Sequence, residues 1–115
     1  MDLDVTTRFQ GDDAVLAVDG EIDLTTCKHL REKLDATDAA PVKNVVIDLT
    51  GVGFIDSTGL SVLVGAAKHA HEGGRGFGVV ADGHLRELLR ITGLDTVMEV
   101  HRRLDQALAE KPLGA

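Results

Sequence analysis

Apolar and polar residues alternate in the first part of the chain with the period of a β-strand. The apolar side chains of 3–9 recur at every second position, and Ala14–Val18 forms a second, more apolar run. Gly11-Asp12-Asp13, between the two runs, supplies residues that favour turns. The pattern predicts an opening β-hairpin, which the sequence Gly20-Glu21-Ile22-Asp23 interrupts.

A helical period follows, and then the most apolar strand of the sequence. Thr25 or Thr26 is expected to cap a helix that runs to about Ala36, with its apolar stripe at positions 27, 30 and 34. The segment 44–50 predicts a strand, and its continuous apolar run at 45–47 indicates burial on both faces. Gly51-Val52-Gly53 is expected to form a loop.

The second half of the chain alternates helical and strand patterns. Helices are expected at 58–71 and 84–92, the second with Gly93 at its C′ position, and a last helix at about 102–110. Strands are expected at 77–81 and 96–101. The element order is therefore β-β-α-β-α-β-α-β-α, which predicts a single α/β domain without repeats or linkers.

Composition and charge narrow the classes of function. The formal net charge of −7 and the three aromatic residues argue against binding to nucleic acid, which requires cationic and stacking side chains. No apolar run reaches the length of a membrane span, and the N-terminus does not resemble a signal peptide. The one cysteine, Cys27, cannot form an internal disulfide. We expect a soluble cytoplasmic protein that binds neither nucleic acid nor membrane.

The segment FIDSTGL, residues 54–60, places polar residues where an apolar strand meets a helix. Its apolar residues, Phe54 among them, are expected in the core. Asp56 or Ser57 could simply cap the helix. Capping does not explain the second hydroxyl of Thr58, or Gly59 in the first turn, where it lowers helix propensity. We interpret Gly59 as keeping the backbone open to an approach from outside, and local physics leaves capping and recognition equally open.

A phosphate on Ser57 is physically reasonable at this position. A seryl phosphate carries about −1.5 to −2 charges at neutral pH. The free N–H groups and the dipole of a helix N-terminus favour such an anion. Asp56 opposes it, although salt partly screens two solvated charges.

Other chemistries have weaker support in the sequence. A nucleophilic Ser57 would need a general base and oxyanion donors, and neither a Gly-x-Ser-x-Gly sequence nor a nearby histidine accompanies it. His69 and His71 are two residues apart, so a helix points them in different directions and no metal site is expected. Cys27 is interpreted as a small buried residue, and any redox role is left open.

Three segments together resemble a known family. They are VVIDLTGVGFIDSTGLSVLVGAAK at 45–68, GEID at 20–23 and LLRITGLDTVMEV at 88–100. These motifs are similar to those of the STAS domain of anti-sigma-factor antagonists, and the resemblance covers nearly the whole chain. It implies one domain over 1–115 with an ordered core at about 3–110. Its mixed sheet of four to five strands would have four helices packed mainly on one side.

The resemblance also implies a function. The unphosphorylated protein would bind an anti-sigma factor that is also a serine kinase, and so release a sigma factor. Phosphorylation at Ser57, with Thr58 as a weaker acceptor, would switch binding off, and a PP2C-type phosphatase would restore it. Asp23, Asp56, Ser57, Thr58 and Gly59 are the implied contact residues. ATP and Mg²⁺ would belong to the kinase, and this chain would be a substrate without a cofactor or catalytic machinery.

Two alternatives remain at this point. Some STAS domains are never phosphorylated and act as scaffolds in stress-signalling complexes. A phospho-aspartate receiver domain is similar in size, and Asp48 at the end of a buried strand could imitate its acceptor. Against the receiver, this chain opens with a predicted hairpin and lacks a lysine between Lys68 and Lys111.

Overall fold

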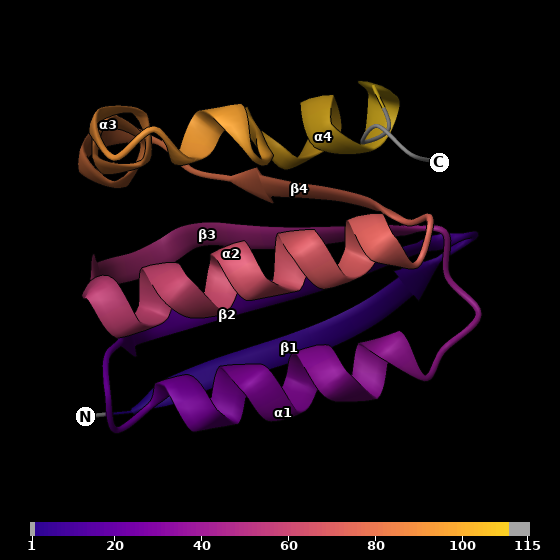
Figure 1. Ribbon diagram of the computed structural model, residues 1–115, viewed down its shortest axis with the longest axis horizontal. Coiled ribbons are helices and arrows are strands. Elements are labelled where there is room, and N and C mark those ends of the chain that lie inside the picture. Colours follow the sequence, from indigo (N-terminus) through magenta and orange to yellow (C-terminus); the bar gives the residue numbers. More distant parts are fainter. Residues whose placement is uncertain (1, 111–115) are drawn as a thin grey trace.

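One five-stranded sheet organises the molecule, and its strands follow one another in chain order, β1-β2-β3-β4-β5 (Figure 1). The computed structural model describes residues 2–110. The first two strands pair antiparallel, and the other three pairings are parallel. The strands are β1 (Leu3–Gln10), β2 (Asp13–Ile22), β3 (Asn44–Ile55), β4 (Gly76–Val80) and β5 (Glu99–His101).

Helices connect the parallel strands, as parallel pairing requires. The main core contains side chains from the first three helices, and the fourth packs on the opposite face of the sheet against Val46 and Val80. The helices are α1 (Cys27–Asp38), α2 (Ser57–Glu72), α3 (Gly83–Ile91) and α4 (Leu104–Glu110), with the short 3-10 turn η1 (Leu94–Thr96) before β5. The predicted α/β order and mixed sheet are therefore confirmed.

The central strand is buried on both faces, as its apolar run predicts. Val45 and Ile47 belong to the main core, whereas Val46 belongs to the smaller cluster under α4. Cys27 is also buried, as expected. Gly93 has a φ of 76° directly after α3, which confirms its predicted place at the helix C-terminus.

Three predictions about the strands are wrong. The Gly20 segment does not end β2, because the strand continues to Ile22 through two shifts of register. Gly20 has a φ of 119°, and a Cβ there would meet the Asp2 carbonyl at 2.3 Å, so glycine makes an irregularity inside the strand rather than a break. Residues 51–53 belong to β3 and form no loop. The last strand covers only 99–101, because η1 occupies Leu94–Thr96.

The parallel pairing brings the carboxyl ends of β2 and β3 to the same edge of the sheet. Ile22 at the end of β2 pairs in register with Ile55 at the end of β3. Asp23 and Asp56 therefore follow two neighbouring strand ends, and α2 begins immediately after the second. This edge holds most of the residues that the sequence selects as functional.

Candidate functional site

Asp56 caps helix α2 and leaves the hydroxyl of Ser57 free. The Asp56 carboxylate accepts a hydrogen bond from the Gly59 N–H at 3.0 Å, and the Asp56 N–H donates to the Ile22 carbonyl at 3.1 Å. Ser57 is the first residue of α2 and is exposed, and its hydroxyl makes no hydrogen bond among the described residues 2–110. Helix capping therefore explains Asp56, whereas the Ser57 side chain makes no contribution to the cap.

The first turn of α2 keeps two backbone donors available. The N–H of Gly59 bonds to the Asp56 side chain, and that of Leu60 bonds to the Asp56 carbonyl. Within the described part of the chain, the N–H groups of Ser57 and Thr58 have no acceptor. These groups and the helix dipole favour an anion at this position.

Gly59 faces the interior, so its interpretation as an opening toward the outside is wrong. The residue is buried, and a Cβ built on it would lie 2.6 Å from side-chain atoms of both Ile22 and Ile55. Only glycine lets the first turn of α2 approach the ends of β2 and β3 this closely. Gly59 thus positions Ser57, and its burial gives no support to a direct contact with a partner.

Asp23 organises the loop between β2 and α1. Its Oδ1 accepts hydrogen bonds from the Thr25 hydroxyl at 2.7 Å and from the N–H groups of Thr25 and Thr26 at 2.9 and 3.0 Å. The hydrogen bond from the Thr25 hydroxyl is the largest of several that lower the pKa of Asp23 from its ordinary value. The charged carboxylate therefore holds the loop in shape beside the strand ends.

Thr26 is the residue before α1, but its hydroxyl does not cap the helix as expected. The hydroxyl donates to the Glu21 carbonyl at 2.7 Å and accepts from the Asp23 N–H at 2.9 Å. These bonds fold the loop back on the end of β2. Thr26, a residue type that commonly caps helices, therefore stabilises the loop before α1 instead.

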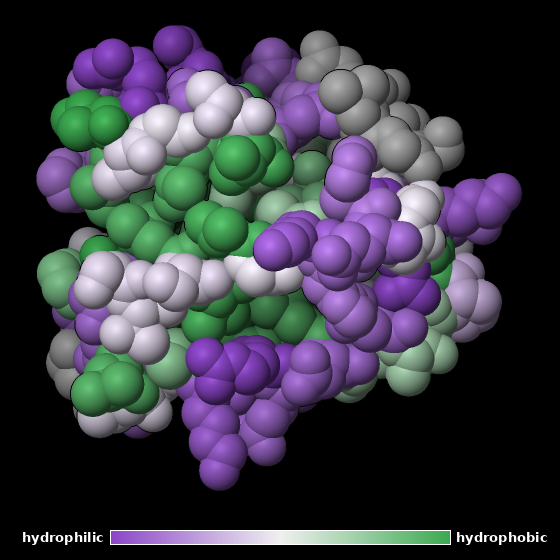
Figure 2. All heavy atoms as spheres, viewed as in Figure 1, coloured by the Kyte–Doolittle hydropathy of each residue, from purple (hydrophilic) through white to green (hydrophobic). Residues whose placement is uncertain are grey.

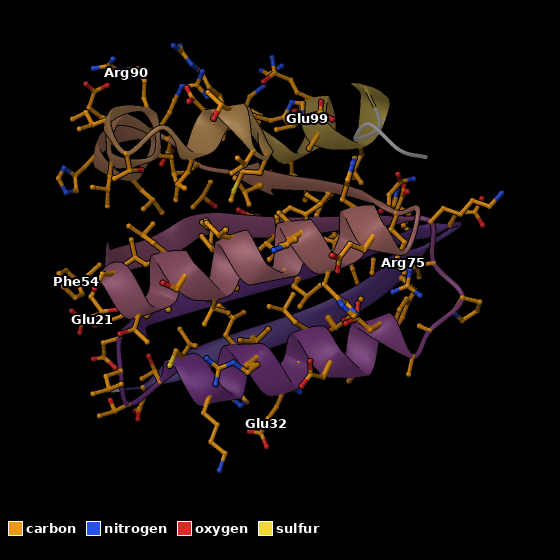
Figure 3. The ribbon with its side chains drawn as sticks, viewed as in Figure 1. Glu21, Glu32, Phe54, Arg75, Arg90 and Glu99 are labelled. Carbon is orange, nitrogen blue, oxygen red and sulfur yellow. The ribbon has the colours of Figure 1, made fainter. Side chains whose placement is uncertain are left out.

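Two large apolar side chains at this edge are exposed, and the sequence analysis missed both. Phe54 is 50% exposed, so its predicted place in the core is wrong, and Leu24 is 73% exposed. Phe54 pairs in register with Glu21 near the ends of β3 and β2, and Figure 3 shows these two side chains together at that edge. The signal was available in the strand period, because Ile55 points into the core and its neighbour must point the other way.

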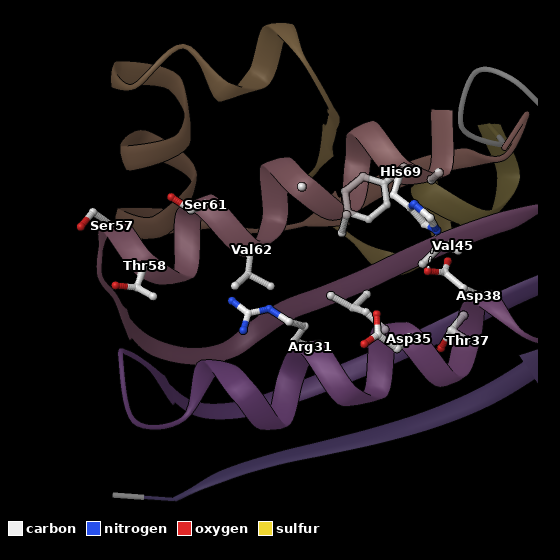
Figure 4. A pocket seen from close by; sticks show the side chains of 15 residues that line it. Arg31, Asp35, Thr37, Asp38, Val45, Ser57, Thr58, Ser61, Val62 and His69 are labelled. Carbon is white, nitrogen blue, oxygen red and sulfur yellow. Dashed lines mark ion pairs between the residues drawn. The ribbon is translucent and has the colours of Figure 1, made fainter. Parts of the chain in front are cut away.

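Thr58 differs from Ser57 in its surroundings. Thr58 is partly buried and points from α2 toward the groove between α2 and α1, whereas Ser57 lies at the exposed end of the helix (Figure 4). Both line the mouth of that groove. The exposure of Ser57 agrees with its rank as the better acceptor for an external enzyme.

The described residues contain no group of three or more His, Cys, Asp or Glu side chains that could hold a metal ion. The Ser57 hydroxyl has no hydrogen bond to a base within 2–110, so the geometry offers no activated nucleophile. Among the described helices, none combines the length and the apolar character that crossing a membrane requires.

Comparisons with known proteins agree on one family. A family model described as "Mlab, STAS domain" matches residues 5–101. The anti-sigma-F factor antagonist RsfB of Mycobacterium tuberculosis is 35% identical over 105 residues, which are 90% of this chain and 85% of that protein. The anti-sigma-B factor antagonist of Staphylococcus aureus is 28% identical over 102 residues, covering 88% of this chain and 94% of that protein.

A solved structure extends the likeness to three dimensions. The crystal structure of an anti-sigma factor antagonist from Mycobacterium paratuberculosis superposes with a TM-score of 0.86 and 32% sequence identity. The superposition covers 95% of this chain and 93% of that one. Sequence and fold therefore indicate the same relatives over nearly the whole chain.

Proposed function

This chain belongs to the STAS domain family, and from that premise we propose that it is an anti-sigma-factor antagonist controlled by phosphorylation of Ser57. Two relatives, at 35% and 32% identity, are named as anti-sigma factor antagonists, and the similarity covers 85% and 93% of their lengths. The observation that carries the switch is the free, exposed Ser57 hydroxyl at the start of α2, beside a cap that Asp56 already provides. The partner is an anti-sigma factor.

The site has the composition of a protein interface. Exposed Leu24 and Phe54 offer apolar anchors, and Glu21, Asp23 and Asp56 surround them with negative charge. Interfaces commonly have an apolar centre with a polar rim, and complementary charge speeds association. We infer that the anti-sigma factor presents an apolar pocket with basic residues around it.

Phosphorylation would change this surface without unfolding the domain. The phosphate adds about two negative charges beside Asp56, and the free N–H groups of Ser57 and Thr58 can donate hydrogen bonds to its oxygens in the folded protein. A bulky, strongly hydrated dianion in the middle of the contact surface would clash with a partner pocket that fits the small serine, and it would have to lose its water on binding. Binding is then lost while the fold is retained, which is what a reversible switch needs.

The enzymes of the switch are separate proteins in this proposal. The anti-sigma factor acts as the serine kinase and supplies ATP and Mg²⁺, and a PP2C-type phosphatase removes the phosphate. This chain is a substrate that needs no cofactor and acts in the cytoplasm, where sigma factors work. Thr58 is a second, poorer acceptor because it is partly buried.

Variants of Ser57 test the proposal. Ser57→Ala should bind the anti-sigma factor as the wild type does and should resist inactivation by kinase and ATP. Ser57→Asp should bind at least about tenfold more weakly, because it places a larger, charged side chain that must lose its water against the apolar pocket of the partner. Ser61→Asp, one turn further along α2, is the matched control for charge at a helical serine. Equal affinities of the wild type, Ser57→Ala and Ser57→Asp, with unchanged circular dichroism, would contradict the proposal that phosphorylation of Ser57 controls binding.

The alternative of a scaffold that is never switched keeps the same interface. A scaffold would bind its partner through Leu24 and Phe54 but would acquire no phosphate at Ser57 when incubated with the anti-sigma factor and ATP. Phosphosite mapping by mass spectrometry after that incubation separates the two. The receiver alternative is excluded by the family match, and Asp48 lies within β3 with its carboxylate bonded to the Thr50 hydroxyl at 2.7 Å.

A further inference from the structure

A groove of about 510 Å³ lies between α1 and α2, and Ser57 lies at one end of it. Pockets that bind small ligands commonly measure about 300–1,000 Å³. In Figure 2 the groove is the apolar hollow between the pale ridge of α2 and the hydrophilic side chains of α1. Its floor consists of core side chains from both helices and from the sheet, namely Leu34, Val45, Val62 and Phe77.

One end of the groove collects polar groups that the protein leaves unused. The hydroxyls of Ser57, Thr58 and Ser61 line this end, and within the described chain none makes a hydrogen bond. Serine and threonine hydroxyls inside helices often bond back to a carbonyl one turn earlier, as Thr37 does to Lys33 at 2.9 Å. Three free hydroxyls on one helix end are therefore available to a ligand.

Arg31 adds an unpaired cation at the same end. The side chain rises from α1 toward α2, and Thr58 and Val62 point down from α2 toward it (Figure 4). Among residues 2–110, no ion pair or hydrogen bond engages its guanidinium group. A guanidinium group binds carboxylates and phosphates through parallel hydrogen bonds. The unpaired Arg31 therefore favours binding of an anion at this end of the groove.

At the other end the polar side chains are paired with one another. His69 of α2 lies 3.0 Å from the Asp38 carboxylate at the end of α1, and Arg75 bonds to the same carboxylate at 3.1 Å. Asp35 lines the wall between this end and Arg31. The Asp38 carboxylate is already paired and Asp35 is negative, so Arg31 is the cation of the groove that stays available to an anionic group.

We propose that the groove binds a small monocarboxylate with an apolar tail, of the chemical class of a medium-chain fatty acid. The carboxylate pairs with Arg31 and accepts a hydrogen bond from the Thr58 hydroxyl, which points toward the groove (Figure 4), while the tail lies on the apolar floor. A bound ligand would cover the groove side of the α2 N-terminus and slow modification of Ser57. This regulatory consequence rests on the proposed function, whereas binding of the ligand itself does not.

Binding of decanoate to the full chain tests the proposal without any partner protein. Isothermal titration below the micelle concentration of decanoate should give saturable binding of one molecule. Acetate, which lacks the tail, and methyl decanoate, which lacks the charge, should each bind at least about tenfold more weakly. NMR shifts should concentrate on the methyl groups of Leu34 and Val62, which lie on the floor.

Two variants separate the head from the tail. Arg31→Ala should weaken decanoate binding about tenfold or more, whereas Lys28→Ala, which removes a charge from α1 outside the groove, should not. Gly65→Leu should abolish binding by filling the groove. A Cβ at Gly65 meets nothing within 4 Å, and leucine favours a helix, so this variant should fold normally.

Three results would overturn the proposal. They are absence of saturable decanoate binding to the wild type, equal binding of methyl decanoate, and binding that survives Gly65→Leu in a protein whose thermal unfolding is normal. None of them bears on the binding of an anti-sigma factor at Leu24 and Phe54. A failure of the ligand site is therefore distinguishable from a failure of the proposed function.

Discussion

The two ends of helix α2 use their polar side chains in opposite ways. At the C-terminal end, Arg75 donates to the Asp38 carboxylate and to the carbonyls of Asp38 and Ala40 at 2.8–3.1 Å, and His69 contacts the same carboxylate. At the N-terminal end, the Ser57 hydroxyl and the first two N–H groups have no partner in the described chain. Satisfied polar groups hold the helix to the fold, and unsatisfied ones leave a surface for another molecule.

Arg75→Ala should remove the hydrogen bonds at the C-terminal end of α2 and give the largest loss of stability. Arg75 is 20% exposed and makes three hydrogen bonds, so its removal leaves a carboxylate and two carbonyls poorly paired. We expect the free energy of unfolding to fall by about 2–4 kcal/mol in chemical denaturation. Arg90→Ala, which removes an exposed and solvent-screened pair with Glu87, should change it much less. Similar losses in both variants would contradict the assignment.

Gly59→Ala should disturb the functional end through packing alone. The added methyl group would lie 2.6 Å from atoms of Ile22 and Ile55. We expect a loss of roughly 1–2 kcal/mol, because overpacking outweighs the gain in helix propensity. Gly65→Ala in the same helix meets no atom within 4 Å and should instead stabilise the protein. Thermal and urea unfolding of the pair measures the difference, and a stable Gly59→Ala would show that the first turn can move.

Phe54→Ala and Leu24→Ala should separate binding from stability. Each side chain is at least half exposed, so truncation should leave the free energy of unfolding within about 1 kcal/mol of the wild type. Affinity for the anti-sigma factor should fall about tenfold in each case if these side chains are interface anchors. Ile91→Ala, 67% exposed at the end of α3, is the control that should bind normally. Normal binding by both test variants would show that the anti-sigma factor binds at another surface.

Asp23 should give the smallest effect, and one that depends on pH. Hydrogen bonds, first that from the Thr25 hydroxyl, lower its pKa below the ordinary value of 3.8. A carboxyl group whose pKa is lower in the folded protein stabilises it above the unfolded value, and this contribution is lost as pH falls through the lowered folded value. Asp23→Asn should therefore reduce the loss of thermal stability between neutral and strongly acidic pH. Parallel profiles for the two proteins would contradict a role for the charge.

The order of elements could be predicted because apolar periodicity is strong in this chain. The run at 45–47 and the helical stripe of α2 leave little choice of structure. The extent of β2 and β3 could not be predicted, because Gly20 and Gly51 resemble breaks in the sequence. In the fold, Gly51 faces Asp19, and a Cβ there would overlap its carboxylate at 1.9 Å. Both positions require glycine because another part of the chain lies against the backbone there, and the sequence alone does not reveal such contacts.

The candidate site was predictable in part for a similar reason. The position of Ser57 follows from its place between an apolar strand and a helix. The assignment of the cap to Asp56 and the inward role of Gly59 depend on which atoms meet after folding. Leu24 and Phe54 were missed because apolar residues are expected inside, although the strand period already places Phe54 on the opposite face from the buried Ile55.

The order of the strands in the sheet has a consequence for how the protein folds. Each strand pairs with the next one along the chain, so no pairing skips a strand. The β1–β2 hairpin closes the shortest loop, whereas each parallel pairing must first close a crossover that contains a helix, which makes it the slower step. We expect the β1–β2 hairpin to serve as the template on which each later strand docks in turn. The chain can therefore build the edge that carries Ser57 before β4 and β5 have joined the sheet.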